Sequence, residues 1–137
     1  MSITLESMEI TLDYKFAYKP LLVGGGAMAY YGLRPRGADI DFILHEKDYN
    51  ALAAKYPENK KDIYGDFGVV KDCYEVWRTI MMQGYEHMKQ EVVEYNGYLV
   101  SSLERLLFLK ALGISEPKYE ADVRLIVKKI IQNIYKE

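Results

Sequence analysis

Two groups of residues near the N-terminus have the types and the spacing that phosphate chemistry needs. Three consecutive glycines, Gly24, Gly25 and Gly26, follow a short apolar run, and Asp39 and Asp41 stand two positions apart at the start of the next one. On a β-strand, residues two positions apart point to the same side, so this pair places two carboxylates next to each other. Like charges repel, and a strand gains nothing from them unless a cation binds. Because Mg²⁺ takes oxygen ligands from carboxylates and from substrate phosphates, the pair predicts a magnesium site.

The glycines by themselves allow three interpretations. Gly24, Gly26 and Ala29 match the G-x-G-x-x-G/A pattern of dinucleotide-binding turns, but the chain lacks the alternating strands and helices of a doubly wound sheet. The glycines could instead serve only a tight turn and the close packing of a helix on a sheet. In the third interpretation, their backbone N–H groups approach an anion at the start of a helix and hold a triphosphate. The acidic pair that follows favours the third, because both motifs would then open onto the same edge of the sheet.

The elements that must position these residues follow from hydrophobic periodicity and from turn residues. Asn96-Gly97 between two apolar runs predicts a β-hairpin, and Ser101-x-x-Glu104 predicts the capping box of a helix that Gly113 ends. The segment 59–66 is polar and is expected to form a loop. Helices are expected over residues 3–16, 27–31, 47–56, 102–112 and from Pro117 to about 135, with one or two helical turns over 84–90. Strands are expected over residues 21–23, 39–44, 67–71, 73–80 and both arms of the hairpin.

This order of elements predicts an α/β or α+β domain with a small mixed sheet flanked by helices and a C-terminal helical pair. At 137 residues the chain is expected to be a single domain, with a core over residues 18–101 and C-terminal helices over 102–137.

Composition excludes several classes of protein. The net charge is −2, so there is no global basic field for duplex nucleic acid, and a nucleotide or another small molecule suits the chain better. No segment is apolar enough to predict a membrane span, and the N-terminal residues lack the pattern of a signal peptide. The single cysteine, Cys73, excludes an internal disulfide and predicts a reducing compartment, with the cytoplasm as the default.

The stretch G-G-G-A-M-A-Y-Y-G-L-R followed by D-I-D-F resembles the opening motif of the DNA polymerase β-like nucleotidyltransferase superfamily. It is most similar to the small bacterial members, such as antibiotic nucleotidyltransferases and those of abortive-infection and toxin–antitoxin systems. The resemblance covers residues 21–44 and is only suggestive beyond them. It implies the nucleotidyltransferase fold and the transfer of a nucleoside monophosphate from a nucleoside triphosphate, usually ATP, with Mg²⁺ as cofactor. The acceptor could be a drug, a metabolite, a protein side chain or an RNA end, and a toxin–antitoxin partner is a further implication.

Carried over residue by residue, the resemblance assigns the triphosphate to the three glycines and the metals to Asp39 and Asp41. It also implies a third carboxylate on a later strand, which helps to ligate metal or takes the proton of the acceptor hydroxyl. Glu75 is the favoured candidate because it lies within an apolar strand, where a charge needs a reason. Asp72 is the alternative, and a plain surface acid is the remaining interpretation.

Basic residues could complete a phosphate site. Arg34 and Arg36 precede the acidic pair, and Lys110 or Lys118 could reach a terminal phosphate from the helical pair. Solvated surface roles are the alternative for each of them. Small members of the superfamily carry Thr where Gly37 stands, and Asp where Glu75 stands. These departures leave a second hypothesis open, in which the chain is a non-catalytic descendant that acts as a binding or antitoxin protein.

Overall fold

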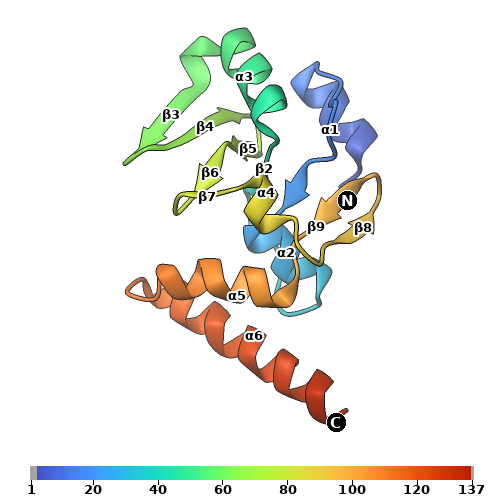
Figure 1. The fold of residues 1–137 in the computed structure, drawn as a ribbon, viewed down its shortest axis with the longest axis vertical. Coiled ribbons are helices and arrows are strands. Elements are labelled where there is room, and N and C mark those ends of the chain that lie inside the picture. The colour runs from blue at the N-terminus through green and yellow to red at the C-terminus, as the bar shows by residue number, and fades with distance from the viewer. Residues whose placement is uncertain (1–2, 137) are drawn as a thin grey trace.

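A mixed sheet forms the centre of the protein, for which the computed structural model describes residues 3–136 (Figure 1). Its seven strands within the described residues are β1 (Leu21–Leu22), β2 (Ile40–Ile43), β3 (Lys60–Ile63), β4 (Asp66–Lys71), β5 (Tyr74–Trp77), β8 (Val93–Tyr95) and β9 (Tyr98–Val100). They lie in the order β3-β4-β5-β2-β1-β9-β8. β2 runs parallel to β5 and antiparallel to β1, and β1 runs parallel to β9. The expected mixed α/β class is therefore confirmed.

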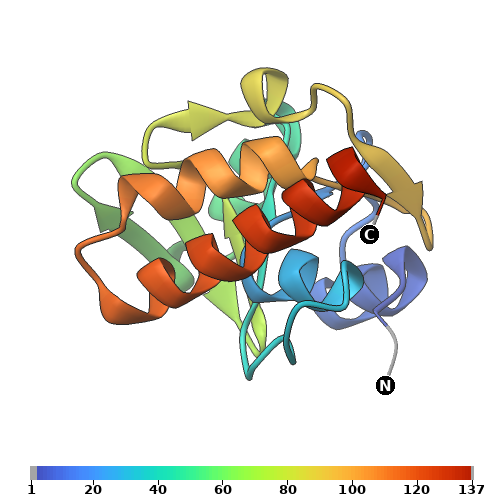
Figure 2. The same ribbon diagram turned by 90° about the horizontal axis from the view of Figure 1, so that it is seen from below.

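Helices surround this sheet, and a small second hairpin extends from it. The hairpin consists of β6 (Thr79–Ile80) and β7 (Gln83–Gly84). The helices are α1 (Leu5–Leu12), α2 (Gly24–Tyr30), α3 (Glu46–Lys55), the 3₁₀ turn η1 (Pro57–Asn59), α4 (Tyr85–Met88), α5 (Leu103–Leu112) and α6 (Pro117–Tyr135). The expected C-terminal pair is present, because α5 and α6 run side by side, in front of the sheet in the view of Figure 2. Among the described residues, no helix combines the length and the apolar character that crossing a bilayer requires.

The alternation of side chains along β2 divides the core. Ile40 and Phe42 are 3% and 0% exposed and belong to the larger cluster, which also holds Met8 of α1 and Leu52 of α3. Ile43 belongs to a second cluster with residues of β1, α4 and α5. Since alternate residues of a strand share a side, Asp41 points to the same side as Ile43. Ile40 and Phe42 thus point into the larger cluster, on the side of β2 opposite to Asp41.

Local turn chemistry was predicted well at the hairpin between β8 and β9. Asn96 and Gly97 have φ values of 53° and 88°, the two positive values that a type I′ turn requires. The capping box was placed one residue early, because the N-cap of α5 is Ser102, whose Oγ accepts the N–H of Arg105 at 3.1 Å. Ser101 is buried and donates its backbone N–H to Leu22 instead.

Two further expectations about elements were wrong. The polar segment 59–66 is not only a loop, because β3 pairs antiparallel with β4, from Lys60 opposite Val69 to Ile63 opposite Asp66. Backbone pairing with β4 stabilises this strand, although every one of its side chains is exposed. The first helix is shorter than residues 3–16, since Asp13 with φ of 50° ends it.

A buried carboxylate fixes the segment that leads into β1. Asp48 in α3 is 1% exposed and accepts three hydrogen bonds, from the Tyr14 hydroxyl at 2.6 Å and from the backbone N–H groups of Ala17 and Tyr18 at 3.1 and 2.9 Å. Buried carboxylates are stable when their oxygens are bonded in this way. Asp48 thereby joins α3 to the chain that enters β1.

Replacing Asp48 by alanine should therefore lower the free energy of unfolding by about 2–3 kcal/mol, because three donors lose their acceptor and an unsatisfied buried donor costs about 1–3 kcal/mol. Urea unfolding monitored by circular dichroism measures the change. Glu46→Ala, at an exposed acid in the first turn of the same helix, is the control and should cost about 1 kcal/mol or less. Equal effects of the two substitutions would contradict the role of Asp48.

Candidate functional site

The register between β2 and β5 brings two of the predicted acidic residues together. Asp41 lies directly opposite Glu75, and because the strands are parallel, both side chains point to the same side of the sheet. Asp39 directly precedes β2 and is exposed, whereas Asp41 and Glu75 are half-buried. The alternative third acid, Asp72, lies in the turn between β4 and β5 with φ of 54° and is exposed. Of the two candidates, Glu75 is thus the one that lies beside Asp41.

The three carboxylates act on one another electrostatically. Burial raises the pKa of Glu75, and the charges of Asp41 and Asp39 together with a hydrogen bond to Asp39 raise it further. Burial also raises the pKa of Asp41; the indole of Trp77 opposes this rise, the charge of Asp39 adds to it, and Lys110 is among the groups that lower it. Without a cation, ionisation of Asp41 and Glu75 is therefore unfavourable, as expected for a site that attracts positive charge.

Trp77 is a further site residue, which the motifs of the sequence do not single out. Its indole Nε1 donates to Asp41 Oδ1 at 3.3 Å. The indole ring also lies against Gly68, where an added Cβ would come within 2.5 Å of Trp77 Cε3. The position of Trp77 two residues after Glu75 on one strand is the signal in the sequence, because residues i and i+2 share a side. Trp77 thus holds Asp41 in one orientation.

The three glycines have different roles. Gly24 has φ of 60°, which a residue with a side chain rarely adopts, and an added Cβ would lie 2.9 Å from Asp41 Oδ2. Gly25 packs on the Arg36 carbonyl oxygen, which an added Cβ would approach to 2.1 Å. Gly26 is buried against Leu22 and serves the packing of helix on strand. Gly24 and Gly25 line the cavity described below, so the packing and the anion-binding interpretations each apply to part of the motif.

A buried ion network joins the loop before β2 to both C-terminal helices. Asp122 of α6 is 2% exposed and accepts from Arg34 Nε at 2.6 Å, from Arg34 Nη2 at 2.8 Å and from Lys110 Nζ at 2.8 Å. Burial by itself would raise the pKa of Asp122, but the bonds from Arg34 and Lys110 outweigh it and lower the pKa. Asp122 was not predicted, since its partner Arg34 is far away in the sequence and no local pattern links them.

The remaining predicted basic residues lie at the same site. The Arg36 guanidinium donates to the carbonyl oxygens of Gly37 and Ala38 at 3.1 and 3.4 Å. Lys118 is exposed at the start of α6, with its Nζ 5.2 Å from the centre of the Tyr119 ring. Lys110 is only 7% exposed. Two of the four predicted basic groups, Arg34 and Lys110, therefore already have a carboxylate partner.

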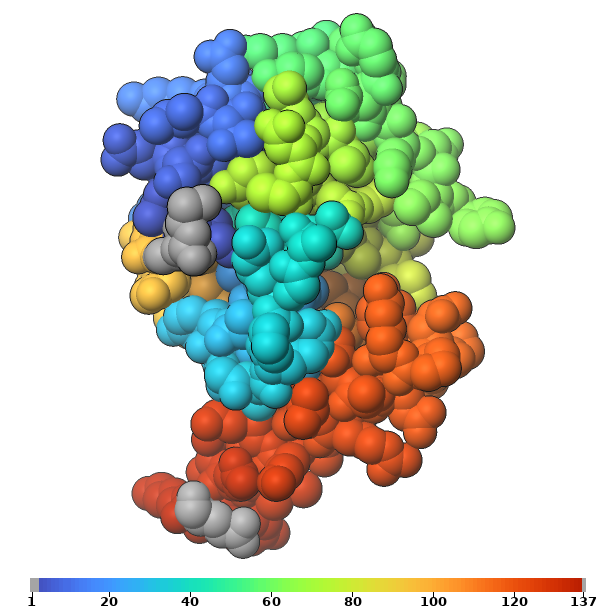
Figure 3. All heavy atoms as spheres, turned by 180° about the vertical axis from the view of Figure 1, so that it is seen from behind, coloured from blue at the N-terminus to red at the C-terminus, as the bar shows by residue number. Residues whose placement is uncertain are grey.

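A cavity of about 780 Å³ collects these groups. Its walls come from the start of α2, the loop before β2, strands β2 and β5, the ends of the β3–β4 and β6–β7 hairpins, α5 and the start of α6. Figure 3 shows the surface hollowed between the cyan segment that leads into β2 and the orange segment around the turn from α5 to α6. The volume lies within the range of small-molecule and cofactor sites. The structure thus brings Gly24, Gly25, all four basic residues and the three acids to one cavity, and leaves Gly26 and Asp72 outside it.

The donor set fits a hard divalent cation, although the acids are not preassembled. Within residues 3–136, no three His, Cys, Asp or Glu side chains are gathered into a ready-made metal group. Mg²⁺ is usually held by only one or two carboxylates, with substrate phosphates and water as its other ligands. Asp41, with Asp39 or Glu75 beside it, meets that requirement.

Comparisons with known proteins gave no relative. No family model matches the sequence, and neither the curated proteins nor the solved structures that were searched contain a match. The mixed α/β fold is therefore established by the structure itself, and the resemblance of residues 21–44 to nucleotidyltransferases stays a prediction from the sequence.

The raised pKa of Glu75 predicts a pH-dependent stability. Because this pKa is higher in the folded protein than in the unfolded chain, ionised Glu75 opposes folding above the raised pKa, and this effect disappears below the usual glutamate range. Glu75→Gln should therefore be more stable than the wild type at about pH 7.5 and lose that advantage at about pH 3.5. Urea unfolding at both pH values, with a chelator to exclude metals, measures the difference.

Glu58→Gln, at an exposed acid in η1, is the matched control and should change stability little at either pH. A Glu75→Gln variant that is less stable than the wild type at about pH 7.5 would contradict the repulsion among the three acids.

Proposed function

We propose that this chain is a Mg²⁺-dependent nucleotidyltransferase, which moves a nucleoside monophosphate from a nucleoside triphosphate, ATP by the resemblance, to an acceptor hydroxyl. One observation carries the proposal: Asp41 and Glu75 are register partners on adjacent strands, with Asp39 beside them, in a cavity that Gly24 and Gly25 also line. The repulsion among the acids supports it, because a site that keeps carboxylates together suits a cation. The acceptor class stays open between small molecules, proteins and RNA ends.

Each site residue has a role in the proposed reaction that follows from its position. Asp39 and Asp41 would hold the metal, which when bound supplies charge stabilisation for an in-line displacement at the α-phosphorus. Trp77 keeps Asp41 oriented through its indole N–H. Glu75 would complete the metal site or accept the proton of the acceptor hydroxyl, a role that its raised pKa suits. The acceptor oxygen forms a bond to the α-phosphorus, the bond from this phosphorus to the bridging oxygen breaks, and pyrophosphate leaves.

The phosphates would lie near the free basic groups. Arg36 and Lys118 line the cavity without a carboxylate partner among the ion pairs of the described residues. The first N–H groups of α2 have no intrahelical acceptors, and its N-cap Val23 offers no side-chain acceptor. Arg34 and Lys110 are engaged by Asp122, so in this proposal they support the site and do not contact phosphate directly.

We propose that residues 18–101 and 102–137 together form one catalytic domain. The Asp122 network supports this, because it connects the loop before β2 with α5 and α6 around the cavity. The single half-buried Cys73 is compatible with the cytoplasm that we propose as the location.

A second function, binding without catalysis, has one observation in its favour. Asp122 engages Arg34 and Lys110, two of the four basic residues at the cavity, and its charge offsets one of their two positive charges, which leaves less positive charge for a triphosphate. A degenerate nucleotidyltransferase fold of this kind would act as a binding or antitoxin protein. Label transfer, measured beside nucleotide binding, distinguishes the two functions.

The catalytic proposal predicts a loss of transfer in an acid variant. The double variant Asp39→Asn with Asp41→Asn should transfer label from α-labelled ATP to acceptors in a cell extract at least about a hundredfold more slowly, since even the outer-shell partners of a metal contribute about 10–100-fold. Glu75→Gln should slow transfer as well, whereas Asp72→Asn, at the exposed alternative acid, should match the wild type. The assay is run with Mg²⁺ and with chelator.

Calorimetry with Mg²⁺ and a non-hydrolysable ATP analogue accompanies the assay. The absence of any nucleotide binding by the wild type would refute the nucleotidyltransferase proposal. Nucleotide binding without label transfer, unchanged in the double variant, would support the non-catalytic binding protein.

A further inference from the structure

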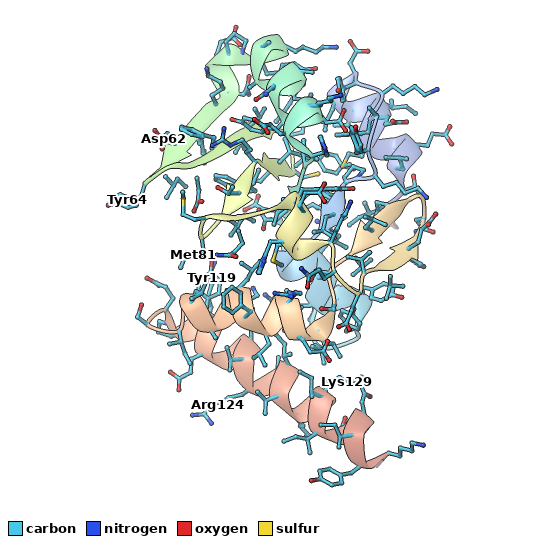
Figure 4. The ribbon with its side chains drawn as sticks, in the orientation of Figure 1. Asp62, Tyr64, Met81, Tyr119, Arg124 and Lys129 are labelled. Carbon is cyan, nitrogen blue, oxygen red and sulfur yellow. The ribbon has the colours of Figure 1, made fainter. Side chains whose placement is uncertain are left out.

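The lining of the cavity includes an apolar group of residues that the chemistry described above does not use. The group consists of Ile63 at the end of β3, Ile80 and Met81 from the β6–β7 hairpin, and Tyr119 at the start of α6. In the view of Figure 4, Met81 lies on the hairpin turn and Tyr119 on the helix below it. Both residues line the same cavity, Met81 from the β6–β7 hairpin and Tyr119 from α6.

The Tyr119 ring is held in place. Gly113, at the end of α5, lies so close that an added Cβ would come within 2.5 Å of Tyr119 Cδ2. The ammonium groups of Lys110 and Lys118 lie 4.8 and 5.2 Å from the ring centre, within the range of cation–π contacts. Tyr119 is therefore fixed by its surroundings, with its ring partly exposed toward the cavity.

The turn that carries Met81 has an unusual backbone conformation that hydrogen bonds stabilise. Met81 and Met82 have φ values of 50° and 61°, which long side chains rarely adopt and which glycine or asparagine normally supplies in such turns. The Asp66 carboxylate holds this conformation, because it accepts the N–H groups of Met81 and Met82 at 2.9 Å each and the Thr79 hydroxyl at 2.7 Å. An unfavourable backbone is kept where it presents a thioether at the cavity.

Several polar side chains near this apolar group already have partners, and Lys118, which lies beside the Tyr119 ring, is assigned above to the phosphates. Asp66 is engaged by the hairpin, Lys110 by Asp122, and the Trp77 indole by Asp41. What the apolar group offers to a ligand is thus a flat ring, a polarizable thioether and two isoleucine side chains. Such a surface binds a planar ring by stacking, but has little means to read hydrogen-bonding groups at its edge.

We propose that Tyr119 and Met81 form a base subsite, in which the base of the nucleotide stacks on Tyr119 and contacts Met81 with little discrimination among bases. The inference rests on the proposed function, because it needs the phosphates at the acidic end of the same cavity. It adds a substrate class: nucleoside triphosphates in general, recognised through the flat face that all bases share.

The test compares ligands with and without a base on the full chain. Calorimetry in Mg²⁺ measures Kd for non-hydrolysable analogues of ATP, GTP, CTP and UTP, and for inorganic tripolyphosphate. The four nucleotides should bind within about tenfold of one another. Tyr119→Ala should weaken the ATP analogue about 5- to 150-fold, the range for loss of one aromatic–base stack, and leave tripolyphosphate unchanged.

Matched variants separate stacking from folding. Tyr119→Phe keeps the ring and should bind as the wild type does, whereas Met81→Ala should weaken the ATP analogue and spare tripolyphosphate. Gly113→Ala touches the ring from behind and should also weaken the nucleotide selectively, because the added Cβ displaces Tyr119. Thermal unfolding of each variant checks that it is folded.

The outcomes distinguish this inference from the proposed function. Unchanged binding of the ATP analogue by Tyr119→Ala and Met81→Ala would overturn the base subsite and leave the nucleotidyltransferase proposal standing. An equal loss of ATP analogue and tripolyphosphate would also overturn the subsite, because the effect would not involve the base. If the wild type bound neither ligand, the proposed function and the subsite would both fall.

Discussion

The cavity exists in this form because one buried carboxylate, Asp122, holds two cations from different parts of the chain. Arg34 comes from the loop before β2 and Lys110 from α5, while Asp122 itself lies on α6. Buried charges are tolerated when they are paired and hydrogen-bonded, and removing one member leaves the others uncompensated at a cost of about 3–5 kcal/mol. The network therefore gives the helical pair a defined position against the sheet, where apolar packing alone would permit sliding. The polar and the apolar walls of the cavity both depend on that position.

Whereas the Asp122 network stabilises the fold, the acids that line the same cavity destabilise it. Burial and the charge of Asp39 raise the pKa of Asp41, and burial with the charges of Asp41 and Asp39 raises that of Glu75, so ionised Asp41 and Glu75 oppose folding unless a positive charge joins them. Two buried apolar clusters, one on each side of β2, offset this cost. Locally unfavourable residues kept on a well-packed scaffold are typical of sites where function and stability conflict. That contrast with the fully satisfied Asp122 is the strongest physical reason to place chemistry at the acids.

Local signals in the sequence predicted the elements better than the connections between them. Asn96-Gly97 determined its hairpin and Pro117 the start of the last helix, because turn and cap chemistry depends on a few adjacent residues. The pairing of Asp41 with Glu75 follows from strand register, which no single segment encodes. The ion network was missed for the same reason, since Arg34 and Asp122 are joined only by the fold. Of the candidate site, the residue types were predictable, whereas their orientation, such as the indole bond to Asp41, was not.

The edge strand β3 has a charged sequence that suggested a loop, and this charge has a physical consequence. Its residues, Lys60, Lys61, Asp62 and Ile63, are all exposed, and three of the four are charged, which is why the segment resembled a loop. β3 ends one side of the sheet, so one of its backbone edges has no neighbouring strand among the described residues. Free edges invite pairing with other chains, and charged side chains, lysine above all, prevent it. The same charged side chains that made the segment resemble a loop therefore disfavour pairing of the β3 edge with the sheet of another molecule, and so disfavour aggregation.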